Sequence, residues 1–274
     1  MAGVFLGLSI QERSSRGGRS LHSLRLTRRG ESWEVSLLLP LILAGCRGRR
    51  AGRELGVLGG YSWASTVIPY LSFMEELTTL YEAFTFLRSL KREEQEALAS
   101  VTHRRELRRR QYILQDGDVC RYYTFVVQGC MKMYHIDGQG KEHALLFGVE
   151  GDWIADLGSA HHREPSRCFI EAIEPSVILQ IGVPDLWQLW NRFHIFDRYF
   201  RVITEDAYSA LQRRLVLSYS ASGRERYEAF VRDFPHLVSR LPALQIASYL
   251  GITPEFLSKV KREILTAPTK KRPT

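Results

Sequence analysis

The stretch Leu241–Ile264, LPALQIASYLGITPEFLSKVKREI, reads as two short helices joined by a tight turn. The first helix has one apolar face, because four apolar residues recur at helical spacing: Leu244, Ile246, Ala247 and Leu250. Gly251 follows this helix, where a chain leaving a helix often needs the positive φ that glycine adopts without strain. Ala247 is small enough to let two helices approach closely.

The second helix of this stretch is predicted to begin at Pro254. Thr253 has the side chain of a helix cap, and proline suits the first helical position because its missing N–H is not needed there. The buried side is predicted to hold Phe256, Leu257, Val260 and Ile264, and the opposite side Glu255, Ser258, Lys259, Lys261 and Arg262. This pattern predicts the helix-turn-helix that lays its second helix in the DNA major groove. The alternative is an ordinary helical hairpin, but the mixture of cations and hydrogen-bonding groups favours DNA.

The net charge of +8 over 274 residues is unevenly distributed. Residues 1–73 contain ten arginines against four glutamates, with no lysine or aspartate, so they account for +6 and the remaining residues for +2. Positive charge gathers again in residues 253–274, where six cations accompany two glutamates. This local clustering indicates a polyanionic partner more clearly than the overall charge does.

The cysteines and histidines form no pattern typical of a metal or catalytic site. The cysteines are Cys46, Cys120, Cys130 and Cys168. They include no CxxC pair, so free thiols in a reducing compartment are expected. The histidines of the strand-rich region are His135, His143, His161 and His162. They lack the HxH-plus-glutamate arrangement of a jelly-roll metal enzyme, so the sequence predicts neither a metal nor an enzyme.

Residues 1–73 differ in composition from the rest of the chain and lack a long periodic pattern. The apolar run Val35–Ala44 is too short to span a bilayer. The sequence Leu43–Cys46, LAGC, resembles the lipobox of lipoprotein signals, but two glutamates and a long region before the run argue against a signal peptide. We expect a disordered leader or an over-extended translation start, with Met74 as the true start. A lipoprotein signal and an additional module are the alternatives; the expected location is the cytoplasm, with no membrane partner.

Residues 74–182 are predicted to form an antiparallel β-roll. Two short helices come first, over Leu77–Phe86 and Lys91–Thr102. Runs rich in β-formers then alternate with turn residues, and glycines mark the turns: Gly117, Gly129, Gly140 and Gly151. Many short strands at even spacing predict a barrel or jelly roll.

Residues 183–218 are predicted to form one long connecting helix. Apolar residues recur at threes and fours from Leu186 to Leu217, and a helix of about 33 residues would be about 50 Å long. Such a stripe predicts a two-stranded parallel coiled coil in a homodimer, while its aromatic part is expected to pack on the β-roll. Residues 219–274 are predicted to form the helix-turn-helix domain, which begins within Ser218–Gly223, a segment with the composition of a hinge. The predicted fold class is α+β: a β-roll sensor domain, a dimerisation helix and a helical DNA-binding domain.

This order of elements resembles the Crp–Fnr superfamily of bacterial transcription regulators over Met74–Leu265. The motif Ile246–Thr253, IASYLGIT, is long and specific, and Arg226–Ile264 is most similar to the Bacteroidetes-type branch. The resemblance implies a homodimer joined by the long helix and bound to a roughly palindromic site on double-stranded DNA. RNA polymerase is a further candidate partner. The alternative is a small-ligand-binding protein, similar to cyclic-nucleotide-binding proteins, with a degenerate DNA-binding domain.

The resemblance also assigns residues to the DNA interface: Gln245, Thr253, Pro254, Glu255, Ser258, Lys259, Lys261 and Arg262. Glu255 and Lys259 fall where the recognition helix reads bases, since a glutamate can accept from cytosine N4 and a lysine can donate to guanine O6 and N7. Pro254 replaces a family arginine, so one contact is expected to be lost. No winged hairpin is expected after this helix, and Lys270, Lys271 and Arg272 would supply a loose phosphate contact instead.

An effector site is predicted less completely. Cyclic-AMP-binding members of the superfamily carry a Gly-Glu-Leu segment and an Arg-Ser pair about ten residues later. The corresponding residues here are Asp156, Leu157, Ser166 and Arg167. Asp156 is shorter than glutamate and the phosphate-binding pair is incomplete, although Arg167 could still serve. A cyclic nucleotide, another small effector and no effector therefore all remain open.

Overall fold

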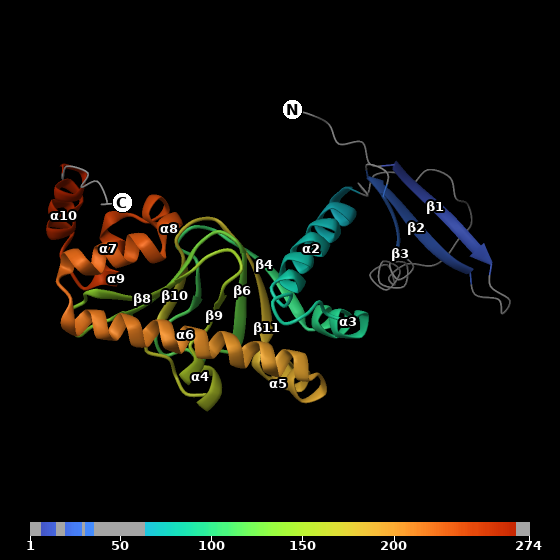
Figure 1. Cartoon of the computed structure of the whole chain (residues 1–274). Helices are drawn as coiled ribbons and strands as arrows, with labels where there is room; N and C mark the ends of the chain where they lie inside the picture. The colour runs from blue at the N-terminus through green and yellow to red at the C-terminus, as the bar shows by residue number, and fades with distance from the viewer. Residues whose placement is uncertain (1–6, 15–19, 29–30, 36–63, 267–274) are drawn as a thin grey trace, which may run out of the picture. The chain divides into compact units, whose positions relative to one another are not determined.

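The computed structural model describes residues 7–14, 20–28, 31–35 and 64–266 (Figure 1). The chain divides into two compact units, Met1–Tyr61 and Ser62–Thr274. The first unit contains an antiparallel sheet of β1 (Gly7–Ser14), β2 (Ser20–Arg28) and β3 (Glu31–Val35), in the order β1-β2-β3. The sequence predicts no regular structure here. In the structure, β1 and β2 pair antiparallel over their whole lengths, from Gly7 with Thr27 to Ser14 with Ser20.

Three other predictions for residues 1–73 are not decided by this sheet. The lipobox-like sequence ending at Cys46 lies outside the described residues. The start of translation and the domain boundaries stay predictions. Met74 is not an element boundary, because it lies inside α2 (Ala64–Glu82), the first helix of the second unit. The next helix is α3 (Arg92–Ser100).

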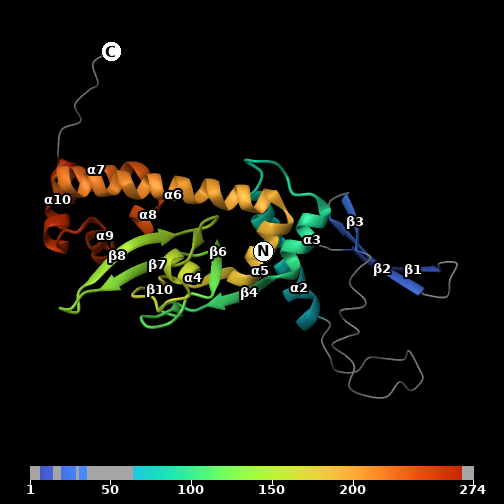
Figure 2. The ribbon, with the colours of Figure 1, turned by 90° about the horizontal axis from the view of Figure 1, so that it is seen from below.

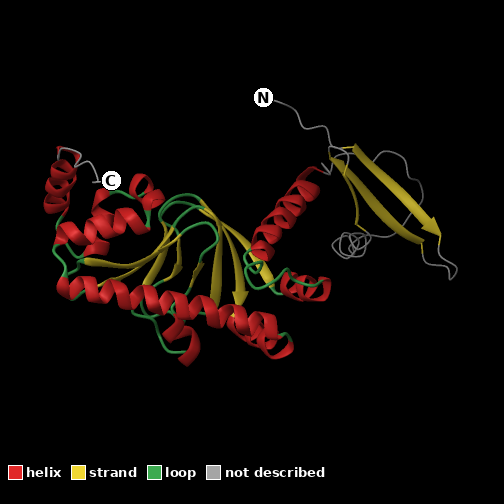
Figure 3. Ribbon diagram, in the orientation of Figure 1, coloured by secondary structure: helices red, strands yellow, loops and turns green. Residues whose placement is uncertain are grey.

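The β-roll consists of two four-stranded sheets, with strand orders β5-β10-β7-β8 and β4-β11-β6-β9. Figure 3 shows its strands in yellow. The strands are β4 (Thr102–Leu107), β5 (Tyr112–Leu114), β6 (Tyr122–Gln128), β7 (Met131–Ile136), β8 (Glu142–Gly148), β9 (Trp153–Ile154), β10 (Phe169–Ala172) and β11 (Ser176–Gly182). All pairings within these two sheets are antiparallel. The predicted antiparallel β-roll is therefore confirmed.

The glycines that mark the predicted turns all have positive φ: Gly117, Gly129, Gly140 and Gly151. Gly129 shows the strongest requirement, because φ is 101° and a Cβ there would lie 2.2 Å from Ser176 Oγ. Neither the backbone angle nor the space admits a side chain without rearrangement. This glycine fixes the approach of the β6–β7 turn to the start of β11.

The predicted long helix is divided in two, which corrects the prediction of one helix over residues 183–218. After α4 (Leu157–His162) and the last strand come α5 (Val183–Arg192) and α6 (His194–Ser220), with only Phe193 between them. Phe193 has an extended backbone, with φ −135° and ψ 108°. Its ring packs edge-on against Phe196 at 5.8 Å between centroids. The break lets the aromatic residues turn into the core.

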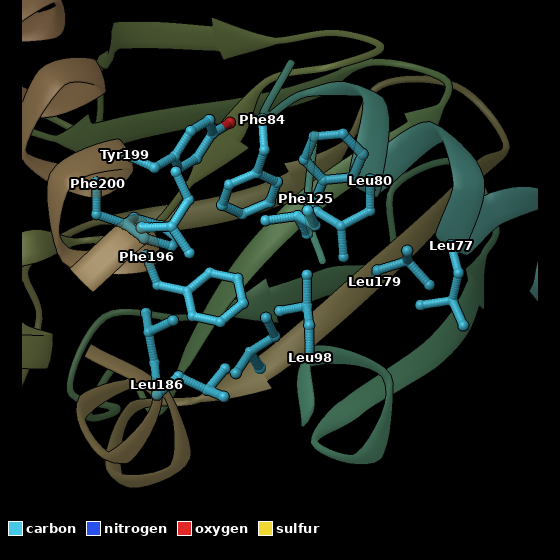
Figure 4. Packing of buried hydrophobic residues seen from close by; sticks show 14 residues of the cluster. Leu77, Leu80, Phe84, Leu98, Phe125, Leu179, Leu186, Phe196, Tyr199 and Phe200 are labelled. Carbon is cyan, nitrogen blue, oxygen red and sulfur yellow. The ribbon is translucent and has the colours of Figure 1, made fainter. Parts of the chain in front are cut away.

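The first part of α6 is packed on the roll, as predicted. Figure 4 shows Phe196, Tyr199 and Phe200 meeting Phe84, in the turn after α2, and Phe125 of β6. The rings of Phe84 and Tyr199 are 4.0 Å apart between centroids. Apolar side chains from α2, α3, α5, α6 and the sheet thus form one core, which stabilises the fold by removing apolar surface from water.

The C-terminal part contains four short helices: α7 (Gly223–Asp233), α8 (Pro235–Arg240), α9 (Ala243–Leu250) and α10 (Pro254–Thr266). Ser222 caps α7 and forms a capping box with Glu225. Figures 1 and 2 show α6 running along the roll, with these four helices gathered at its C-terminal end. None of the helices in the described part of the chain is long and apolar enough to cross a membrane.

Candidate nucleic-acid interface and effector site

Helices α9 and α10 form the predicted helix-turn-helix. Gly251 has φ 65° and ψ 36°, the left-handed conformation predicted for it. The N–H of Ile252 donates to the carbonyl of Ala247 at 3.0 Å and closes the turn. Thr253 Oγ1 accepts the N–H of Phe256 at 3.2 Å, as a helix cap does. Local residue chemistry thus sets the angle between the two helices.

A small apolar core joins the motif to α7 and α8. Its buried members are Cys130 of the β6–β7 turn together with Tyr227, Phe230, Leu237, Leu241, Ile246, Ala247, Leu250, Leu257 and Val260. The prediction that Phe256 lies on the buried side is wrong, because its side chain is 41% exposed. It packs instead over Gly223 at the start of α7, where an added Cβ would lie 2.6 Å from Phe256 Cε1.

The outer side of α10 is open to solvent. Glu255, Ser258, Lys259 and Arg262 are exposed, and their spacing of three and four residues places them along one side of the helix. Ser258 Oγ donates to the carbonyl of Pro254 at 2.9 Å, so its hydroxyl also bonds to its own helix. The described surface therefore presents a carboxylate, a hydroxyl and two cations where a duplex could bind.

Two of the residues predicted to contact DNA are only partly exposed. Lys261 is half-buried, and its Nζ lies 5.8 Å from the centroid of the Tyr227 ring, on the flank of α10 that faces α7. Gln245 is also half-buried, and its Oε1 is buried without a hydrogen-bond partner. Neither side chain points freely outward. Their contacts with DNA stay predictions, as do those of Lys270, Lys271 and Arg272, which lie beyond the described residues.

The C-terminal end of α9 is held by two arginines from the preceding helices. Arg214 of α6 donates from Nη2 to the carbonyl of Tyr249 at 2.9 Å, and its guanidinium lies 3.9 Å from the centroid of that ring. Arg226 of α7 donates to the carbonyl of Leu250 at 2.6 Å. These cations complement the helix dipole and satisfy carbonyls that have no partner inside the helix.

Arg214 also reaches the β-roll. It donates to the carbonyls of Leu145 and Ala144 in β8, the latter at 2.9 Å. Burial lowers the pKa of its guanidinium from the usual value. Among the described residues, Arg214 bonds to backbone carbonyls and pairs with no carboxylate that would offset this burial. One side chain thus connects α6, β8 and α9.

Further contacts attach the C-terminal helices to the roll. Ser248 Oγ donates to the carbonyl of Glu142 at 2.7 Å and accepts the N–H of Ala144 at 3.0 Å. Arg240 of α8 forms ion pairs with Glu150, at 2.7 Å, and with Glu174. The Arg240 guanidinium lowers the pKa of Glu150 to about 2. The sequence does not predict these contacts.

At the predicted effector site, Asp156 and Ser166 bond to each other. Ser166 Oγ donates to Asp156 Oδ2 at 2.6 Å, and Asp156 Oδ1 accepts the N–H of Ser159 at 3.2 Å as the cap of α4. Ser166 is buried. The carboxylate that would accept a ribose hydroxyl is therefore already used inside the protein.

The other two predicted effector residues face outward. Leu157 is 44% exposed at the start of α4. Arg167 is exposed, and its carbonyl, not its guanidinium, bonds to His135 Nδ1 at 2.8 Å. A hollow inside the roll between Cys120 and Ile154 has a volume of about 10 Å³, which is room for about one water molecule. This hollow, which none of the four predicted effector residues lines, is too small for a nucleotide.

Comparisons with known proteins agree with this architecture. Residues 104–193 match the family model of the cyclic nucleotide-binding domain. The fumarate and nitrate reduction regulatory protein of Escherichia coli K12 is 25% identical over 186 residues, which cover 63% of this chain and 73% of that protein. The protein of the same name from Vibrio cholerae is also 25% identical over 186 residues, covering 62% and 74% of the two chains.

Two solved structures share the fold. FixK2 from Bradyrhizobium japonicum superposes with a TM-score of 0.54 at 18% identity, covering 63% of this chain and 90% of that chain. A protein from Eubacterium rectale, described as a regulator of the Crp/Fnr family, gives a TM-score of 0.51 at 12% identity, covering 64% and 84%. At these identities the similarity concerns the fold.

Proposed function

Because the chain belongs to the Crp/Fnr family of transcription regulators, we propose that it is a homodimer that binds a specific sequence of double-stranded DNA. The proposed location is the cytoplasm, and no catalytic role is proposed. Assignment to the Bacteroidetes-type branch stays a prediction. RNA polymerase is a proposed partner on bound DNA.

The open outer side of α10 is the observation that carries this proposal. A recognition helix must be fixed on its inner side and uncovered on its outer side. Leu257 and Val260 are buried, while Glu255, Lys259 and Arg262 are exposed. Lys259 is proposed to donate to guanine and Glu255 to accept from cytosine.

The exposed apolar stripe on α6 supports a homodimer. Tyr208, Leu211, Leu215 and Tyr219 are between 51% and 83% exposed. Their steps of three, four and four residues place them on one side of the helix, as in a coiled-coil seam. Two copies of α6 packed in parallel would cover this stripe and place two α10 helices on the same side of the dimer.

We propose that the effector, if the roll binds one, is not a cyclic nucleotide held in the usual way. The bond between Asp156 and Ser166 occupies the carboxylate, and Arg167 is directed to solvent. In a titration with cyclic AMP, we expect no saturable binding by the protein or by Arg167→Ala. Saturable binding that disappears in Arg167→Ala would contradict this proposal.

Selection of bound fragments from genomic DNA tests the proposed function. We expect repeated enrichment of a palindromic sequence, protected from cleavage over two half-sites about 34 Å apart, one helical turn of DNA. A variant with Glu255→Ala and Lys259→Ala should enrich no such sequence. If the unaltered protein enriches none, the alternative of a ligand-binding protein with a degenerate DNA-binding domain is favoured.

A further inference from the structure

A cleft lies between the β-roll and the C-terminal helices, and we call it the roll–helix cleft. One wall is formed by β8 and the turn after it, including Phe147 and Asp152, and the other by the end of α7 and the chain through α8, including Asp233 and Phe234. Figure 2 shows α8 and α9 next to β8. The volume of the cleft is about 490 Å³, which is within the range of sites that bind small organic molecules.

Two aromatic side chains line the cleft, one from each wall. Phe147 and Phe234 are both half-buried, and both rings pack on Tyr249 of α9, with centroids 5.5 Å and 6.4 Å from the centroid of its ring. Aromatic faces bind the rings of apolar ligands and also attract organic cations. Because α9 is the first helix of the helix-turn-helix, a ligand held by these two rings is one side chain away from the DNA-binding motif.

The charged lining of the cleft is mainly acidic. Glu150, Asp152 and Asp233 contribute three carboxylates. Among the described lining residues, the one guanidinium is that of Arg240. Arg240 already pairs with Glu150 at 2.7 Å and with Glu174. Since a paired guanidinium binds a further anion less well, the cleft favours a positively charged ligand.

Asp152 and Asp233 are the carboxylates available to such a ligand. Asp152 Oδ2 accepts the N–H of Val149 at 2.9 Å, and no arginine or lysine in the described part of the chain forms an ion pair with this carboxylate. Asp152 is exposed to solvent, yet desolvation by the protein around it raises the pKa of its carboxyl, and the N–H of Val149 and the nearby His236 offset this only in part. Asp233 pairs with its neighbour Arg232 at 3.0 Å on the exposed surface, where such a pair is weak. Both carboxylates can therefore pair with a bound cation.

An organic cation suits the cleft better than a metal ion does. Within the described residues, no group of three histidine, cysteine, aspartate or glutamate side chains could hold a metal ion. A metal ion needs several ligand atoms at once, whereas an ammonium group is bound by one or two carboxylates and by aromatic faces. The carboxylates and rings of the cleft therefore match an ammonium group carried on an apolar body.

From these observations we infer that the roll–helix cleft binds a small aromatic amine. Its ammonium group pairs with Asp152 and Asp233, and its ring packs against Phe147 and Phe234. Because these residues belong to both walls, the ligand links the roll to the helices that position α9 and α10, and it favours one arrangement of them. The amine is thus an effector of DNA binding. This effector role rests on the proposed function, whereas the binding of the amine does not.

Calorimetric titration of the full chain without DNA tests the binding. The probes are tryptamine and phenethylamine, together with indole-3-acetate, which carries the opposite charge on the same ring as tryptamine. We expect saturable binding of at least one amine, and affinity at least about tenfold lower for indole-3-acetate, because the lining carboxylates repel it. Binding of neither amine, or a preference for indole-3-acetate, would overturn the inference.

Two variants locate the bound amine. Asp152→Asn combined with Asp233→Asn removes both charges but keeps an oxygen for the N–H of Val149, and it should bind the amine at least about tenfold more weakly. Asp233→Asn alone removes a negative charge from the C-terminal end of α7, where it opposes the helix dipole, so this variant should stay folded even if the double variant does not. The matched control is Asp206→Asn, an exposed carboxylate of α6, which should bind as the unaltered protein does. Unchanged affinity in both cleft variants, with circular dichroism showing that they are folded, would contradict the assigned site.

A titration of the selected operator, with and without a saturating concentration of the bound amine, tests the effector role. We expect the operator affinity to change by at least about fivefold, and the operator to change the affinity for the amine by the same factor. If the protein binds the amine but selects no operator, the proposed function fails and the cleft site stands. If the protein selects an operator but binds neither amine, the inference alone is overturned. Amine binding that leaves the operator affinity unchanged would overturn the effector role.

Discussion

Lys259 and Glu255 are exposed residues of α10 whose side chains have the chemistry to distinguish base pairs. Replacing Lys259 by alanine should weaken operator binding by about 1–3 kcal/mol and relax the preference at one guanine–cytosine pair. The control is Lys261→Ala, which removes the same charge from the flank that faces Tyr227. Competition with operators that each carry one changed base pair measures the affinity and the base preference of each variant. Equal loss on every operator after Lys259→Ala would contradict the assigned role.

The ion pair between Arg240 and Glu150 predicts a dependence of stability on pH. Arg240 lowers the pKa of Glu150 from 4.5 to about 2, so the folded state favours the ionised form. The stabilisation is present above the ordinary pKa and is lost as the pH falls toward about 2. Arg240→Gln should lower the free energy of unfolding by about 1 kcal/mol at pH 7, because the pair is partly exposed.

That difference between Arg240→Gln and the unaltered protein should shrink as the pH falls from about 4.5 to about 2. Over this range Glu150 binds a proton in the unfolded chain, while in the folded, unaltered protein it stays ionised. Urea unfolding at a series of pH values measures it. The control is Arg92→Gln, which breaks an exposed pair with Glu96 and should change little. A difference that stays constant down to pH 2.5 would contradict the role given to this pair.

The residue-level predictions that succeeded were local. Gly251 and Thr253 act on neighbours one to five positions away, so their chemistry can be read from the sequence. Arg214 bonds to a carbonyl 35 residues away, and Arg240 to a carboxylate 90 residues away. Such partners are brought together by the tertiary fold, and periodicity contains no information about them. In the sequence, the role of Arg214 is indicated only by the position of a charged residue among apolar ones.

At the scale of elements, α6 has two parts with different surroundings. Phe196 and Phe200 near its start are buried in the roll core, while Leu211 and Leu215 near its end are exposed. Periodicity predicts a helix with an apolar stripe but cannot say which partner covers each part. It also misses the break at Phe193, because the spacing of apolar residues continues through it.

The exposed part of α6 gives a prediction about oligomeric state. A variant with Leu211→Glu and Leu215→Glu places two charges at the centre of the proposed seam, where like charges face each other across the dimer. We expect a folded monomer in sedimentation equilibrium, where the unaltered protein is a dimer. Arg213→Gln, on another side of the helix, should remain dimeric. A dimer of unchanged affinity in the double variant would assign the interface to another surface.

The junction of α6, β8 and α9 gives a prediction about stability. Arg214→Ala leaves carbonyls of Ala144 and Tyr249 without their donor, which should cost about 2–4 kcal/mol of unfolding free energy. Amide hydrogen exchange in α9 should accelerate more than exchange in β6. Arg214→Lys keeps the charge but has fewer donors, so its unfolding free energy should lie between those of Arg214→Ala and the unaltered protein. Uniform acceleration throughout the chain would argue against a specific role in holding α9.

At the scale of the whole molecule, the α+β architecture follows from evenly spaced β-rich runs between turn glycines and from apolar residues spaced at threes and fours. The turn glycines and the β-rich runs predicted the β-roll, and Leu241–Ile264 predicted the helix-turn-helix. The placement of that motif against β8 could not be predicted, because it depends on the bonds of Ser248 and Arg214 to a distant strand. The pairing of Gly7–Ser14 with Ser20–Arg28 was missed because backbone pairing leaves no long apolar pattern.

The proposal depends on two α10 helices of one dimer reading a duplex together. The most direct test compares binding to the selected palindromic operator with binding to a scrambled duplex of equal length at about 0.15 M salt, by fluorescence anisotropy. We predict two protomers per operator and an affinity at least about a thousandfold higher for the operator. Equal affinity for both duplexes, or one protomer per operator, would contradict it.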